Sequence, residues 1–181
     1  PEKLGELIKK FAEAGKEKVA FNLAGHLLKI IPTSGESKET DKMNRPLDQH
    51  QYKETLEKIV QPLLQLNSER AFNLFFDLLK TALDFKYAQK EHLTDLSYIW
   101  RPAVEESKYN RHQRGINFHL SNAVRTAAEV WSEKDNSNVP KIIVKLENGK
   151  WTILGRIALH ILKLFPEANL ETTKEKILDI S

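Results

Sequence analysis

The 181-residue sequence contains no cysteine. Disulfide bonds, thiolate zinc sites and a cysteine nucleophile are therefore excluded. Glycine and proline are scarce, with seven of each, which favours a helical chain over a turn-rich β fold. No apolar run approaches the roughly 20 residues that a membrane-spanning helix needs. These absences predict an all-α protein, and the lack of cysteine fits a cytoplasmic location.

Composition and charge place few further limits on the chain. Hydrophobic residues make up 40% and charged residues 29%, values typical of a folded protein, and the length suits one domain over residues 1–181. The 28 basic and 25 acidic side chains leave a net charge of +3. This excess is too small to indicate a nucleic-acid partner by itself.

One stretch of the sequence occurs twice. Residues 13–32 read EAGKEKVAFNLAGHLLKIIP and residues 147–166 read ENGKWTILGRIALHILKLFP, with 8 of 20 positions identical. A second match aligns AFNLAGHLLK at residues 20–29 with AFNLFFDLLK at residues 71–80, with 7 of 10 identical. A recurring helical unit is typical of stacked-helix arrays, in which each unit buries its apolar face against its neighbours.

Apolar residues at helical spacing predict the individual helices. The expected ranges are residues 3–14, 16–31, 48–66, 69–87, 102–131 with an interruption near Gly115, 140–147, 150–165 and 172–180. Ser68 is expected to cap the fourth helix, and Pro102 to break the chain at Arg101. The β-branched run at residues 141–146 also fits a strand, but the repeat favours a helix. Residues 33–45 are polar and aperiodic and predict a mobile loop, either a solvated linker or a functional lid.

Paired helices that recur every 35 to 50 residues resemble the HEAT and armadillo class of α-solenoids. The resemblance implies a right-handed superhelix of about four antiparallel helix pairs. The spacings of 51, about 49 and about 34 residues fit no standard repeat of that class. Residues 48–64 and 97–112 further resemble helical regions of large bacterial signal-transduction NTPases of the STAND type, in which such arrays sense a ligand or mediate assembly. The sequence has no Walker motif, so an ATPase activity would lie outside it.

The ends of the sequence lead to a further expectation. The chain starts at Pro1 without an initiator methionine, and its last predicted helix stops at Ser181. We therefore expect a segment of a longer protein, with apolar surface exposed at one or both ends of the array.

A polar stripe recurs on the helices that the repeats align. Each copy has three residues at spacing i, i+4, i+7, which share one helix face. The three trios are Asn22, His26 and Lys29; Asn73, Asp77 and Lys80; and Arg156, His160 and Lys163. Stacked units would turn the trios into a ladder along a concave groove suited to a peptide or an acidic partner. The alternative is an ordinary solvated helix face.

Two other features are candidate sites. The basic segment at residues 108–114 (KYNRHQR) offers Lys108, Tyr109, Arg111 and Arg114 for phosphate contact and base stacking, although two glutamates precede it. The tripeptide at residues 100–102 (WRP) fits either an interface anchor or a plug that seals two helix pairs, with Arg101 stacked on an aromatic ring. We favour the plug.

The histidines show no pattern of metal ligation. His26 and His160 have no histidine or carboxylate at i+3 or i+4, and metal sites require clustered ligands. His112 and His119 are expected to have structural or surface roles. We expect no metal and no cofactor.

No motif supports catalysis, since the chain lacks a G-x-S-x-G elbow and an acid–base carboxylate pair. The sequence predicts a non-catalytic scaffold or sensor segment of a larger cytoplasmic protein. It would bind another protein or a neighbouring domain through its concave face. The alternative is a helical-repeat domain that binds nucleic acid through the basic segment.

Overall fold

A computed structural model describes residues 2–31, 46–87, 96–105, 107–110 and 115–169 of the chain. These residues form eight α-helices and three short 3-10 helices, and they contain no β-strand. The prediction of an all-α fold is confirmed. The expected loop at residues 33–45 and the expected helix at residues 172–180 lie outside the described residues. No described helix combines the length and the apolar character needed to cross a bilayer.

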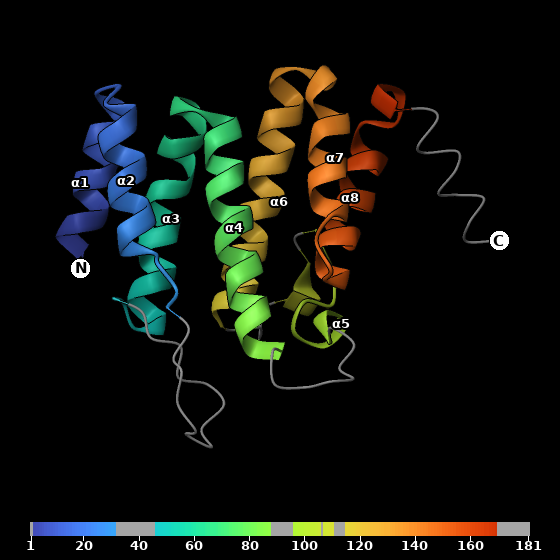
Figure 1. The fold of residues 1–181 in the computed structure, drawn as a ribbon, viewed down its shortest axis with the longest axis horizontal. Coiled ribbons are helices and arrows are strands. Elements are labelled where there is room, and N and C mark those ends of the chain that lie inside the picture. The colour runs from blue at the N-terminus through green and yellow to red at the C-terminus, as the bar shows by residue number, and fades with distance from the viewer. Residues whose placement is uncertain (1, 32–45, 88–95, 106, 111–114, 170–181) are drawn as a thin grey trace.

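The elements follow the chain from one end of the molecule to the other (Figure 1). In order they are α1 (Glu2–Glu13), α2 (Glu17–Leu27), α3 (Gln49–Leu66), α4 (Ser68–Tyr87), α5 (Ser97–Trp100), η1 (Lys108–Asn110), α6 (Ile116–Lys134), η2 (Asn136–Asn138), α7 (Val139–Glu147), α8 (Thr152–Leu164) and η3 (Pro166–Asn169).

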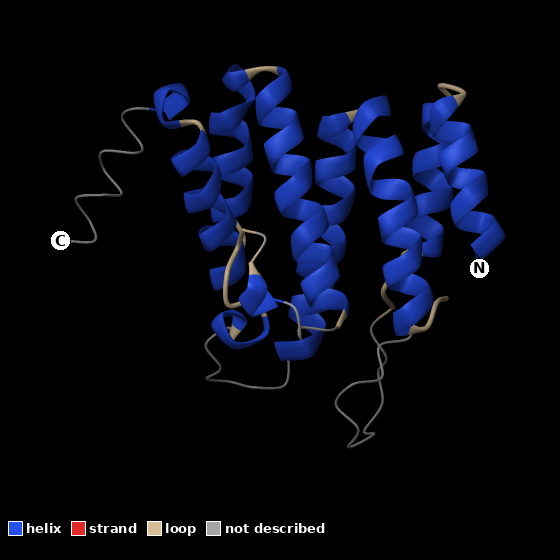
Figure 2. Ribbon diagram, turned by 180° about the vertical axis from the view of Figure 1, so that it is seen from behind, coloured by secondary structure: helices blue, strands red, loops and turns tan. Residues whose placement is uncertain are grey.

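The long helices form two rows. The rear row contains α1, α3, α6 and α8, each packed against the next, and Figure 2 shows this row from behind. The front row contains α2, α4 and α7 and faces the viewer in Figure 1. Helix α2 packs on α1 and α3, α4 packs on α3 and α6, and α7 packs on α8. The hydrophobic core lies between the two rows.

Two hydrogen bonds show that α4 and α7 run in the same direction. Lys145 of α7 donates to Asn73 near the start of α4 at 2.6 Å, and the indole of Trp151, which follows α7, donates to Asp84 near the end of α4 at 2.9 Å. Helix α8 therefore runs back along the rear row beside α6. The repeat aligns α2 with α8, yet α2 belongs to the front row and α8 to the rear row. Similar sequence does not mark equivalent positions in this array.

Local signals explain most helix ends. Gly15 has φ +67°, and the amides of Gly15 and Lys16 donate to Ala12 and Phe11 at 3.0 and 2.8 Å, the Schellman pattern that ends α1. Asp48 caps α3, and Gln51 completes a capping box. Helix α3 continues through Pro62.

The structure tests four predictions made from the sequence. Residues 141–146 are helical, and the break at Arg101 is present, because this residue ends α5. The prediction that Ser68 caps α4 is wrong, since the Asn67 side chain accepts from the Arg70 amide at 2.9 Å. The predicted helix after Pro102 is also wrong, because the next long helix starts only after Gly115.

Large buried side chains join the rows. Phe72 of α4 is fully buried and lies 5.5 Å from the ring of Trp131 of α6, centroid to centroid. Tyr52 of α3 is also fully buried, and its hydroxyl donates to the Leu28 carbonyl at 3.0 Å. Leu28 follows the last residue of α2, so α2 ends short of the predicted residue 31.

Candidate functional site

The front row carries two of the three predicted trios. Asn22 and His26 of α2 and Lys29, two residues past its end, are exposed, and their side chains make no hydrogen bond or ion pair within the described part of the chain. These three side chains can therefore bind a partner without breaking an internal contact.

The trio on α4 is partly engaged by its neighbour α7. Lys145 of α7 donates to Asn73 and lies 3.9 Å from the carboxylate of exposed Asp77, with its ammonium 5.0 Å from the Phe76 ring. Lys80 pairs with Asp84 within α4 at 2.7 Å. This face therefore mixes donors with both signs of charge.

The third trio lies in the rear row, so the three trios do not form one ladder. Arg156 donates to the Pro102 carbonyl at 2.8 Å, and Lys163 donates to Glu105 at 3.1 Å. His160 is buried, with 8% of its surface exposed. These residues attach a loop to α8, and only the first two trios lie in the front row.

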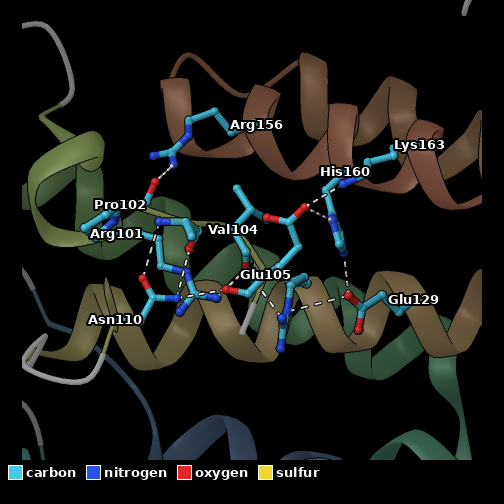
Figure 3. Close-up of polar contacts among 11 residues, drawn as sticks. Arg101, Pro102, Val104, Glu105, Asn110, Glu129, Arg156, His160 and Lys163 are labelled. Carbon is cyan, nitrogen blue, oxygen red and sulfur yellow. Dashed lines mark hydrogen bonds and ion pairs between the residues drawn. The ribbon is translucent and has the colours of Figure 1, made fainter. Parts of the chain in front are cut away.

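That loop, described at residues 101–105 and 107–110, lies against α6 and α8 (Figure 3). Arg101 is 1% exposed, donates to the Val104 carbonyl, and places its guanidinium 4.8 Å from the centre of the Phe118 ring. The same carbonyl accepts from Arg125 of α6 at 3.4 Å. The plug interpretation of residues 100–102 is confirmed for Arg101, and Trp100 packs partly buried against the core.

Asn110 explains why the loop is not helical. Its amide donates to the carbonyls of Ala103 and Glu105 at 3.1 and 2.8 Å and accepts from the Ala103 amide at 3.3 Å. A side chain that satisfies three backbone groups offers the segment an alternative to the helix ladder.

His160 sits between two carboxylates at this junction. Its Nε2 lies 2.7 Å from Glu129, and its Nδ1 lies 3.7 Å from Glu105. Glu129 is also 3.6 Å from Arg125. A hydrogen bond from its own backbone amide, together with one from Lys163, lowers the pKa of Glu105. The cluster therefore links α6, α8 and the loop through a buried imidazole that lies between two carboxylates.

Among the described residues, no group of three or more histidine, aspartate or glutamate side chains is placed to hold a metal ion.

The basic segment is described only in part. Lys108 is exposed in η1, whereas the side chain of Tyr109 and all of Arg111 and Arg114 lie outside the described residues, as does His112. His119 is partly buried on α6, and this burial lowers its pKa, with Lys53 acting in the same direction.

Sequence reasoning missed the residues that build the loop junction. Glu129 and Arg125 are an i, i+4 pair on α6, a spacing that indicates an ion pair but not its third partner on α8. Nothing in the sequence indicated the role of Asn110, because its three hydrogen bonds depend on a turn that the helical pattern did not predict.

Comparisons with protein-family models, with curated proteins and with solved structures found no match to this chain.

Proposed function

We propose that this chain is a non-catalytic interaction segment that binds a protein partner or a neighbouring domain along its front row. The arrangement proposed is an α-solenoid, a right-handed superhelix of antiparallel helix pairs, within a larger cytoplasmic protein. Support comes from the two rows of helices in chain order and from the HEAT-like repeat in the sequence.

The observation that carries the proposal is the exposed trio of α2, which lies in the same row as the trio of α4. Asn22 offers an amide, His26 an imidazole and Lys29 a cation, and none of them is used within the described chain. Asp77 of α4 adds an exposed acceptor. A surface that mixes donors, acceptors and both charges suits a protein better than a uniform polyanion.

Nucleic-acid binding is the second candidate, and exposed Lys108 is the observation in its favour. Acidic side chains counter it, since Lys163 pairs with Glu105 and Lys145 lies close to Asp77. Salt dependence separates the two candidates, because phosphate contacts release counterions and weaken steeply as salt rises.

The test is affinity capture from cell extract with the full chain as bait, at about 50 mM and about 200 mM salt. We expect a protein that is retained at both concentrations. Capture should fail for the front-row variant in which three exposed residues become alanine: Asn22→Ala, Lys29→Ala and Asp77→Ala.

A matched rear-row control changes three exposed residues of α3 of the same types: Gln61→Ala, Lys53→Ala and Glu57→Ala. Both variants lose one lysine, one carboxylate and one amide, so their net charges stay equal. Equal capture by the two variants would refute front-row binding. Nucleic acid captured at low salt and released at high salt would favour the second candidate.

A further inference from the structure

The first helix pair exposes an apolar surface at the N-terminal end of the two rows. Leu4 and Leu7 of α1 are 44% and 40% exposed, and Val19 of α2 is 42% exposed. Helix α1 packs on α2 and α3 only at one side, so its remaining face has no neighbouring helix among the described elements. We call Leu4, Leu7 and Val19, with the pocket described next, the end face.

A pocket opens between α1 and α2 within this face. It has a volume of about 180 Å³ and is lined by Leu4, Ile8, Leu23, His26, Leu27 and Pro46. A protein cavity of about 150 Å³ holds a molecule the size of benzene. The pocket is therefore large enough for one leucine-sized or phenylalanine-sized side chain, with His26 as a polar group at its wall.

The rim of the end face is basic. Lys3 and Lys10 lie on either side of Leu7 along α1, and Lys29 lies near the end of α2. Within the described chain, none of these three lysines forms an ion pair with a carboxylate. The nearby acid Glu6 is 3.7 Å from Lys58 of α3, so its charge is already offset.

We propose that the end face binds an amphipathic helix of another protein, with aliphatic anchors on one side and glutamate or aspartate beside them. Two neighbouring antiparallel helices form a groove that can receive a third helix through anchors at i, i+3 or i+4, and i+7. One anchor fills the pocket, and the flanking carboxylates meet Lys3, Lys10 and Lys29. Complementary charge of this kind sets partner choice and the association rate.

A second copy of the chain fits this surface poorly. Two end faces in symmetric contact would bring basic rims together. The other end of the rows exposes Val144 of α7 and Leu159 of α8, and exposed Lys141 lies one helical turn before Val144. Head-to-tail contact would therefore also bring a lysine toward the basic rim.

The test is a selection with the full 181-residue chain as target. The probe is a displayed library of helical peptides of about 18 residues with leucine at i, i+3, i+4 and i+7, and with glutamate, lysine and glutamine drawn equally at the flanking positions. We expect enrichment of glutamate over lysine. The selected peptide, made synthetically, should lose affinity roughly tenfold or more on Leu7→Asp, as expected for an interface anchor.

Two further variants make the result specific. Val144→Asp introduces the same charge at another exposed apolar position, which lies at the other end of the rows. This variant should leave the affinity for the peptide unchanged. The double change Lys3→Glu and Lys10→Glu should reverse the selection toward lysine-flanked peptides. Failure to enrich any peptide, enrichment without charge preference, or equal loss with Leu7→Asp and Val144→Asp would each overturn the proposal. Leu7, Lys3 and Lys10 lie outside the front row, so failure here leaves front-row binding intact.

Discussion

Replacement of Arg101 by methionine should loosen the loop that begins at this residue and destabilise the fold. Methionine keeps an unbranched apolar stem but removes the guanidinium. The loss then includes the charge-assisted hydrogen bond to the Val104 carbonyl, about 1.5–3 kcal/mol, and the contact with the Phe118 ring, about 1–2 kcal/mol when desolvated. The Val104 carbonyl keeps Arg125 at 3.4 Å, so no acceptor is orphaned and the lower values apply. We expect a loss of about 2.5 kcal/mol.

The assay is urea unfolding followed by circular dichroism, supported by thermal unfolding. A loss of about 2.5 kcal/mol should lower Tm by roughly 5–10 °C for a chain of this size. Arg101→Lys should fall between wild type and Arg101→Met, because lysine keeps the charge but not the planar fork. Lys108→Met, at an exposed position of the same loop, should change stability by no more than about 0.5 kcal/mol. Wild-type stability of Arg101→Met would refute the reasoning, since a buried guanidinium exchanged for an apolar chain would then be neutral.

Three further predictions concern the core and the titrating groups. Phe72→Ala should destabilise the chain by about 3–5 kcal/mol in urea unfolding, because it leaves a cavity where the ring packs against Trp131 of α6. A loss under about 1 kcal/mol would contradict the packing of the two rows. Lys163→Gln should raise the pKa of Glu105 in a carboxyl NMR titration, but only in part, because the backbone hydrogen bond is the larger cause of its lowering; no rise would show that this ion pair is not formed. Burial lowers the pKa of His119 in the folded protein. The contribution of this residue to the free energy of unfolding should therefore be fully present above the pKa of the unfolded state and decline as pH falls through the folded pKa. His119→Asn should flatten that decline, and an unchanged pH profile of stability would contradict the burial of this histidine.

Much of the fold followed from periodicity and from turn chemistry. The apolar spacing placed α1, α3, α4, α7 and α8 to within a few residues, because each buries one stripe of a continuous core. Helix α1 ends within one residue of the predicted position, because Gly15 tolerates the positive φ of the turn that follows. Helix α2 ended early, where the Leu28 carbonyl meets the buried Tyr52 hydroxyl, a tertiary contact with no local signal.

The candidate sites were less predictable. The repeat made α2 and α8 look equivalent, although the chain had changed row between them. The long helices alternate between the rear and the front row, and α8 is the fifth long helix after α2, so the two helices lie in opposite rows. A sequence alignment does not show which row a helix occupies. The difference in row explains why His160 is buried against Glu129 while His26, its aligned counterpart, is exposed.

Hydrogen exchange of the chain, alone and in complex with a captured protein partner, tests the central claim most directly. Front-row binding predicts slower exchange in α2 around His26 and in α4 around Asp77, with little change in α3 and α6 of the rear row. Protection confined to α3 and α6, or no protection in any helix, would contradict an account in which the front row is the binding surface.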